Sequence, residues 1–110
     1  MSFHVNNVVI GGYISHDQEL RTTPSGKKVT DLRIGIDAED KNDKDKSYFI
    51  QVAVWGATAE SVCRWLKKGS PLVVIGRLIV DEWTDKESGA KRSRTKVLAE
   101  RVQFLPKVNG

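Results

Sequence analysis

The chain has 110 residues, 39% of them hydrophobic and 29% charged, which is enough for one soluble globular domain with a modest core but not for two domains. Its formal net charge of +4 permits a polyanionic partner without identifying one. A single cysteine, Cys63, excludes an intramolecular disulfide and favours a reducing compartment. No apolar run reaches membrane-spanning length, and the first residues lack the pattern of a signal peptide, so we expect a cytoplasmic protein with no membrane partner.

Two strands are predicted in the first third of the chain. The first covers residues 7–15 and contains Gly11-Gly12, a pair that predicts a bulge, a sharp bend or the close approach of another backbone. A polar connection follows, and its residues 23–26, Thr-Pro-Ser-Gly, have the composition of a tight turn. The second strand covers residues 28–37. Its aliphatic positions alternate with polar ones, so one face should be covered and the other open to water or a ligand.

Residues 38–47 are almost all charged or polar and cannot bury apolar surface, so we expect a solvated, mobile connector. The third strand, residues 48–55, then alternates between two different faces. One face is aliphatic and should join the core, with Ile50, Val52 and Val54. The other combines aromatic, small and amide side chains, a surface on which a flat ligand can lie, with Phe49, Gln51, Ala53 and Trp55.

Gly56 should end the third strand and begin the single helix. Four residues at helical spacing form a stripe that faces the core, namely Ala59, Val62, Cys63 and Leu66. Lys67 and Lys68 are typical of a helix C-terminus, and Gly69 of the residue that follows it. We therefore expect the helix to run to Lys68.

The last two strands form a predicted hairpin across a polar loop at residues 85–91. The fourth strand, residues 72–84, is apolar on both faces at its start and carries Arg77 and Trp83 on one face. The fifth strand, residues 92–105, begins with a row of basic side chains on one face, Arg92, Arg94 and Lys96. Its second half should return to the core, through Val97, Val102, Phe104 and Leu105.

This order of elements, β-β-β-α-β-β, predicts a mainly β protein. The architecture that fits best is the OB-fold, a five-stranded Greek-key barrel with one helix between strands 3 and 4, because closure removes the edges of a small sheet. A generic α+β sandwich is the alternative. The domain should cover residues 1–106 and leave 107–110 as a short polar end.

The titratable residues do not form a pattern that is typical of an enzyme. His4 and His16 have no partner at ligand spacing, and the chain contains no nucleophile, phosphate-loop or zinc motif. The acidic residues are scattered over loops among lysines. The sequence therefore predicts no catalytic residue, no metal and no cofactor.

The open strand positions instead combine aromatic and basic side chains. A single nucleic-acid strand is held by a basic groove that follows its phosphates and by aromatic faces on which its bases stack. The candidate binding residues are Phe49, Trp55, Trp83, Arg33, Arg77, Arg92, Arg94 and Lys96. Phe49 could equally pack in the core, and Trp65 is expected to be partly buried or to contact another subunit.

Four segments resemble the bacterial single-stranded DNA-binding protein family (SSB). Its opening is matched by residues 6–29, NNVVIGGYISHDQELRTTPSGKKV, and its centre by residues 48–78, YFIQVAVWGATAESVCRWLKKGSPLVVIGRL. Its hairpin is matched by residues 82–92, EWTDKESGAKR, and its end by residues 97–105, VLAERVQFL. The resemblance implies an OB-fold that binds single-stranded DNA without sequence preference in replication, recombination and repair, usually as a homotetramer associated with the nucleoid. By position, Phe49, Trp55 and Trp83 match the family's stacking aromatics, and Arg77 and residues 92–96 its basic lining.

The chain also departs from that family. Asp40 lies near the position of a further stacking tryptophan in some members, and Gln18 and Thr22 replace the more usual proline and tyrosine. The chain ends at Gly110 without the linker and acidic tip that recruit replication and repair proteins in typical members, so we expect a truncated or naturally short form. An alternative function is that of an OB-fold adaptor, resembling primosomal proteins, whose open face binds protein. Such an adaptor does not need Trp55 and Trp83 to be exposed.

Overall fold

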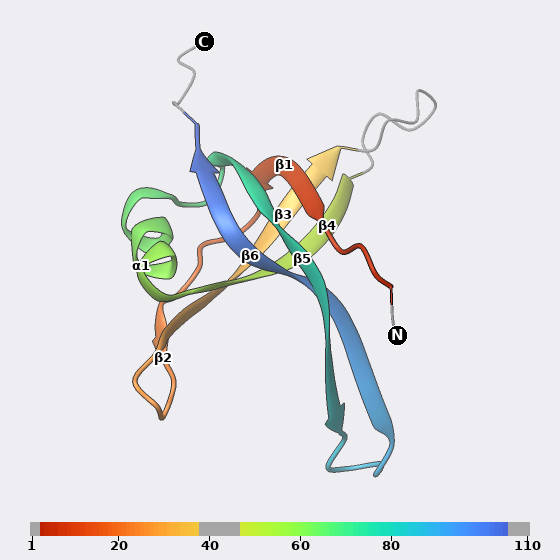
Figure 1. Cartoon of the computed structure of the whole chain (residues 1–110). Coiled ribbons are helices and arrows are strands. Elements are labelled where there is room, and N and C mark those ends of the chain that lie inside the picture. Colours follow the sequence, from red (N-terminus) through yellow and green to blue (C-terminus); the bar gives the residue numbers. More distant parts are fainter. Residues whose placement is uncertain (1–2, 38–46, 106–110) are drawn as a thin grey trace.

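The computed structural model describes residues 3–37 and 47–105. Its elements are β1 (Val8–Ile14), β2 (Arg21–Thr22), β3 (Lys28–Asp37), β4 (Ser47–Trp55), α1 (Gly56–Trp65), β5 (Pro71–Thr84) and β6 (Lys91–Phe104). The strands form one sheet in the order β1-β5-β6-β4-β3-β2, and β1 also pairs with β3, so the sheet closes into a barrel (Figure 1). This arrangement confirms the predicted OB-fold rather than the sandwich. The predictions for the charged connector, for Asp40 and for the polar end at 107–110 fall outside the described residues, except that Ser47 begins β4.

The sequence prediction missed β2. The second, third, fourth and fifth predicted strands are therefore β3, β4, β5 and β6 of the structure. β2 consists of only two residues, Arg21 and Thr22, which pair with Val29 and Lys28 of β3. A strand of two residues is too short to give an alternating pattern in the sequence. The turn between β2 and β3 is as predicted: the Gly26 N–H donates to the carbonyl of Thr23 at 2.8 Å.

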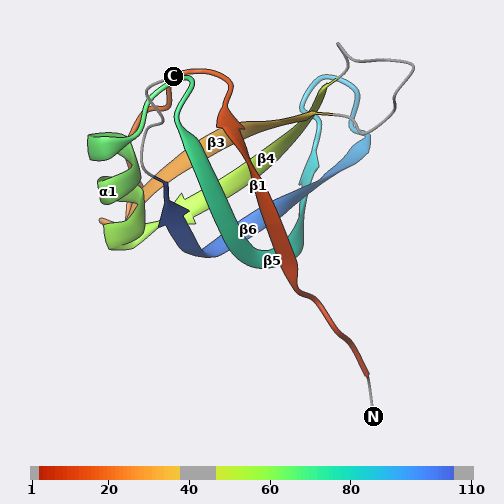
Figure 2. The ribbon, with the colours of Figure 1, turned by 90° about the horizontal axis from the view of Figure 1, so that it is seen from above.

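The core lies inside the barrel and under the helix. The fully buried aliphatic residues come from every long element, among them Ile14, Leu32, Ile34, Val52, Val54, Val62, Leu72, Val74 and Val97. Burying each such side chain contributes about 1.5–3 kcal/mol. Figure 2 shows α1 at one end of the barrel, away from the tip of the β5–β6 hairpin. In the described part of the chain no helix is long and apolar enough to cross a membrane.

Several predicted core and surface positions were wrong. Ala53 is buried although it shares a face with exposed residues, because a methyl group is short enough to be covered by the side chains around it. Phe104 and Leu105 are exposed rather than in the core. Cys63 is only partly buried, and Trp65 is mostly exposed, so of its two predicted roles the contact with another subunit stays a prediction.

The glycine pair in β1 lies where two backbones come close. β1 pairs with β5 as far as Tyr13 and with β3 at Tyr13 and Ile14, so Gly12 sits where the barrel closes. A Cβ atom at Gly12 would lie 2.3 Å from the carbonyl oxygen of Gly35, a separation that real atoms do not adopt. The close approach, one of the three predicted alternatives, is therefore confirmed.

The helix ends three residues earlier than predicted, at Trp65, with Leu66 in an extended conformation. The side-chain amide of Gln18 donates to the carbonyl of Leu66 at 2.9 Å and more weakly to that of Val62 at 3.4 Å, and so caps the helix end from outside the helix. Gly69, with φ +91°, then serves a turn in which the Ser70 N–H donates to the carbonyl of Lys67. The two lysines thus belong to this turn and not to the helix.

We expect Gln18→Ala to destabilise the protein by about 0.5–1.5 kcal/mol, because the carbonyl of Leu66 loses this donor, whereas the carbonyl of Val62 still accepts from the Leu66 N–H. The melting temperature should fall by roughly 4–8 °C for each kcal/mol. Gln103→Ala, the same change at an exposed position, is the matched control and should leave the melting temperature within about 2–4 °C, since surface changes are usually within ±0.5 kcal/mol. Equal melting temperatures for the two variants would show that Gln18 does not stabilise the helix end.

Candidate nucleic-acid interface

The strand register brings the eight predicted binding residues to one face of the sheet. Residues that are direct partners on neighbouring strands point to the same side. Arg33 is paired with Gln51 across β3 and β4, and Ala53 with Leu98 across β4 and β6. Across β5 and β6, Leu98 is paired with Arg77, and the remaining basic residues of β6 face alternate residues of β5. We call this surface the aromatic face; it carries Arg33, Phe49, Trp55, Arg77, Trp83, Arg92, Arg94 and Lys96.

Phe49 lies flat against the sheet at a glycine. Its cross-strand partner is Gly35, and a Cβ atom there would be 3.4 Å from Cε1 of the ring. The guanidinium of Arg33 lies over the ring, 4.6 Å from its centroid, which is within the range of a cation–π contact. Half of the residue remains exposed, so Phe49 is a surface residue and not part of the core.

The two tryptophans of the aromatic face are also partly exposed. Phe49, Trp55 and Trp83 keep 51%, 44% and 45% of their surface accessible, so none of the three is a core residue. Trp55 is the last residue of β4, directly before Gly56, whose φ of +68° turns the chain into α1. Trp83 lies near the end of β5, with the guanidinium of Arg94 5.8 Å from its ring centroid.

A hydrogen bond connects the two halves of the aromatic face. Nη1 of Arg94 donates to Oε1 of Gln51 at 3.0 Å, and Gln51 is the cross-strand partner of Arg33. A hollow of about 420 Å³ lies here between Phe49 and Arg94. The sequence placed Gln51 on this face but gave no sign that it bridges β4 and β6, because that contact depends on the register between strands.

The cations of the aromatic face differ in how far they are already neutralised. Lys96 forms an ion pair with Asp81, and its side chain is only 15% exposed. Arg92 lies 3.4 Å from Asp85. A hydrogen bond from the backbone N–H of Glu87 lowers the pKa of Asp85, so this carboxylate is charged at neutral pH. Among the described residues, the cations of this face without a carboxylate partner are Arg33, Arg77 and Arg94.

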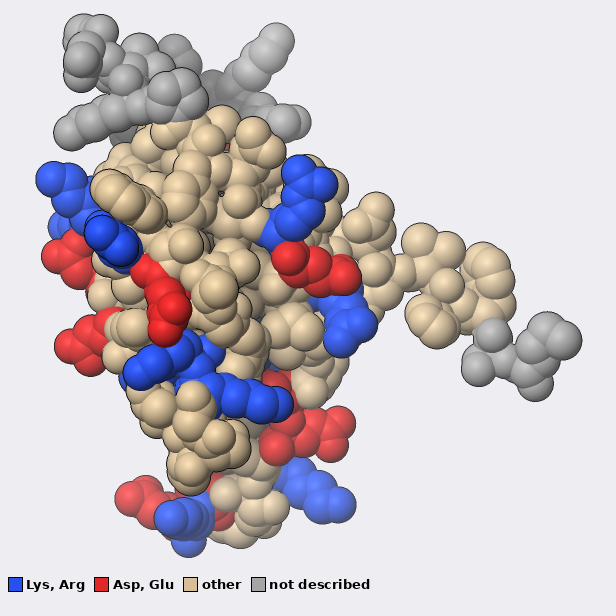
Figure 3. All heavy atoms as spheres, turned by 60° about the vertical axis from the view of Figure 1, so that its left-hand side comes forward, with Lys and Arg blue, Asp and Glu red and all other residues tan. Residues whose placement is uncertain are grey.

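The wider surface is mixed in charge. Figure 3 shows the side of the molecule that carries α1 and β2, where Lys and Arg side chains alternate with Asp and Glu. No group of three or more His, Cys, Asp or Glu side chains gathers as a metal site in the ranges 3–37 and 47–105. This side of the molecule therefore carries interspersed charges of both signs.

A small closed barrel that presents aromatic and basic side chains on one sheet face is typical of the OB-fold proteins that bind nucleic acid. The model of the single-strand binding protein family matches residues 5–105. The chain belongs to this family. Membership agrees with the resemblance seen in the sequence and with the prediction that the chain is not an enzyme.

Relatives from several bacteria are each called single-stranded DNA-binding protein. The protein of Wolinella succinogenes is 38% identical over 104 residues, which cover 91% of this chain and 64% of the relative. The protein of Deinococcus radiodurans is 36% identical over 115 residues, covering the whole chain and 37% of the relative. That of Streptococcus pneumoniae serotype 4 is 35% identical over 103 residues, or 92% of this chain and 65% of the relative. The chain thus spans less than two thirds of the length of these relatives.

Proposed function

We propose that this chain binds single-stranded DNA without sequence preference on the aromatic face. Bases stack on Phe49, Trp55 and Trp83, and phosphates lie beside the arginines between them. The observation that carries this proposal is the half-exposure of three aromatic rings on one sheet face. Each stacked base is worth about 1–3 kcal/mol and requires no particular sequence, because every base has a flat face.

The arginines of the aromatic face that have no carboxylate partner within the described ranges are suited to binding the phosphates of the strand. A guanidinium is planar, stacks on aromatic rings and binds phosphate through two N–H groups. Arg33 lies over the ring of Phe49, so a base stacks there only when Arg33 turns away toward a phosphate. Arg94 beside Trp83 is placed to extend the stacking surface or to turn toward a phosphate. On this proposal the protein covers single strands in the cytoplasm, at the nucleoid, during replication, recombination and repair.

The direct test is binding of fluorescently labelled oligo-dT, measured by anisotropy, in competition with unlabelled single-stranded and duplex DNA. We expect unlabelled oligo-dT to displace the probe and duplex of the same length to displace it poorly, because paired bases cannot stack on the protein. Displacement by duplex and oligo-dT at equal concentrations would contradict the proposal. An adaptor that binds only protein on this face would show no oligo-dT binding at low salt.

Salt dependence should report which arginines meet phosphates. The slope of log K against log salt should be about −0.7 for each phosphate neutralised on a single strand. Arg94→Gln should therefore reduce the slope by about 0.7, whereas Arg92→Gln, which removes a cation already paired with Asp85, should reduce it less. Arg64→Gln removes the same charge from α1, off the aromatic face, and is the control. Equal slopes for the Arg94 and Arg64 variants would show that Arg94 does not contact a phosphate of the bound strand.

We further propose that the chain forms a homo-oligomer, a tetramer by its resemblance to the family. β1 pairs with β3 only at Tyr13 and Ile14, so its first residues have a strand partner on one side only. An edge of this kind, beside exposed apolar Val9 and Tyr13, readily accepts a second strand. Analytical ultracentrifugation tests this: a single species at the monomer mass at every concentration would contradict it.

A further inference from the structure

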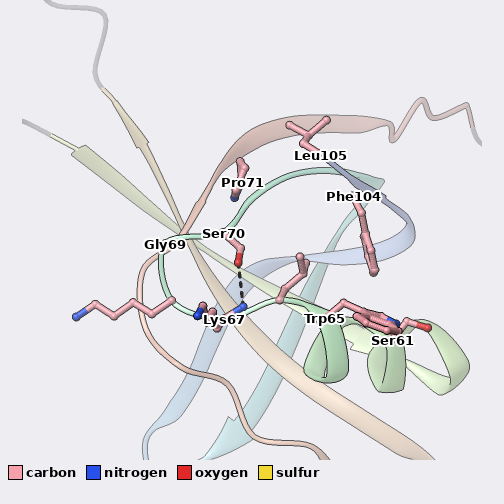
Figure 4. A pocket seen from close by; sticks show the side chains of 10 residues that line it. Ser61, Trp65, Lys67, Gly69, Ser70, Pro71, Phe104 and Leu105 are labelled. Carbon is pink, nitrogen blue, oxygen red and sulfur yellow. Dashed lines mark hydrogen bonds between the residues drawn. The ribbon is translucent and has the colours of Figure 1, made fainter. Parts of the chain in front are cut away.

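A groove of about 780 Å³ lies between the end of α1, the turn that follows it and the end of β6 (Figure 4). Its apolar lining includes Trp65, Leu66, Pro71, Phe104 and Leu105. Figure 4 shows Phe104 pointing from β6 toward Trp65 on α1, with Pro71 and Leu105 on the other side. Trp65 is 66% exposed, and Phe104 and Leu105 are also exposed, which is unusual for three large apolar residues side by side. We call this feature the α1 groove.

The α1 groove has a basic border. Lys67 and Lys68 both line it, and its lining residues include no carboxylate. Next to them Arg64 lies over the ring of Trp65, 5.0 Å from the centroid. Two lysines therefore line the groove, and a third cation contacts its exposed tryptophan. This favours a partner that combines negative charge with an apolar side chain.

The groove is held in shape by hydrogen bonds of its turn, two of which come from distant parts of the chain. The Lys67 N–H donates to Oγ of Ser70 at 3.0 Å, and the Gly69 N–H donates to the carbonyl of Ile14 at 2.8 Å. The Lys68 N–H donates to Oδ1 of Asp17 at 3.0 Å. A turn fixed at this many points does not have to be ordered on binding, so the groove is preformed.

The α1 groove is separate from the aromatic face, because none of the eight residues of that face lines it. A second copy that packs its own groove against this one is a poor occupant, since Lys67 and Lys68 would face the same two lysines.

We propose that the α1 groove binds an acidic peptide segment of a partner protein. An apolar side chain of the peptide sits between Trp65 and Phe104, and its carboxylates lie beside Lys67 and Lys68. The exposed tryptophan at the centre is the kind of residue that dominates binding energy at interfaces. This proposal goes beyond DNA binding and does not depend on it.

A labelled ten-residue peptide of eight aspartates around a central Leu-Phe tests this by fluorescence anisotropy. We expect saturable binding that weakens at least tenfold in Trp65→Ala and again in Lys67→Gln/Lys68→Gln. Trp83→Ala, which removes a tryptophan from the aromatic face, should leave it unchanged. A peptide with lysine for aspartate, or with Gly-Gly for Leu-Phe, should not bind. Absence of saturable binding, or equal binding by the Trp65→Ala variant, would overturn the proposal.

Tryptophan fluorescence shows whether the α1 groove is occupied by the peptide or by DNA. The variant Trp55→Phe/Trp83→Phe keeps Trp65 as its only tryptophan, since the chain has three. Its emission should change when the acidic peptide is added and stay constant when oligo-dT is added. A response to oligo-dT alone would assign the groove to nucleic acid and overturn the proposal.

Discussion

Oligo-dT binding should be almost abolished when Phe49, Trp55 and Trp83 are replaced together by alanine. Each of these residues is about half exposed, and on our proposal each stacks one base, at about 1–3 kcal/mol. A single replacement should raise the Kd by roughly 5- to 150-fold, and even the smallest sum over three rings exceeds about 100-fold. Anisotropy titration of labelled oligo-dT at low salt measures the unsubstituted protein, the three single variants and the triple variant under the same conditions.

The matched control for this series is Trp65→Ala. It removes an exposed tryptophan of the same chain that lies on α1, away from the aromatic face, and should leave the Kd for oligo-dT unchanged. Circular dichroism checks that each variant keeps its fold. If the folded triple variant binds oligo-dT within about threefold of the unsubstituted protein, stacking on these rings does not hold the strand.

Gly12→Ala should strongly destabilise the barrel. The added Cβ would lie 2.3 Å from a backbone oxygen of Gly35 and 2.9 Å from a side-chain carbon of Ile34. Because a strand backbone cannot move aside as a side chain can, we expect a cost at or above the usual range for overpacking, about 1–3 kcal/mol. The melting temperature should fall by roughly 10–20 °C, and β1 should lose its contact with β3 first.

The neighbouring residue provides a close control. A Cβ atom at Gly11 would meet only ordinary contacts, 3.6 Å from Val73 and 3.7 Å from Leu72. Gly11→Ala should therefore leave the melting temperature nearly unchanged or raise it slightly, because alanine restricts the unfolded chain. Similar melting temperatures for the Gly12→Ala and Gly11→Ala variants would show that the backbones of β1 and β3 are farther apart at Gly12 than in this structure.

Alternation along the chain was sufficient to predict the barrel and the sides of its strands. Ile50, Val52 and Val54 face inward because strand residues alternate, and this requires no knowledge of the neighbouring strands. The same rule placed Phe49 and Trp55 on the opposite side. It failed for Ala53, because burial there depends on the length of the surrounding side chains and not on parity.

Features that depend on distant contacts were not predictable. The helix end is fixed by Gln18, 48 residues before Leu66 in the chain, so the local signal from Lys67 and Gly69 was misleading. The bridge from Arg94 to Gln51 and the pairing of Lys96 with Asp81 follow from strand register, which a single sequence does not define. Phe104 looked like a core residue because hydrophobicity alone does not distinguish a core position from the wall of a groove.

The most direct test of the central claim, that a single strand lies on the aromatic face, is tryptophan fluorescence of the Trp65→Phe variant during titration with oligo-dT. Its two remaining tryptophans, Trp55 and Trp83, are both on that face. We predict strong quenching at low salt that weakens as salt rises and is nearly absent with duplex DNA. Unchanged emission while anisotropy reports binding would place the DNA on another surface and contradict the claim.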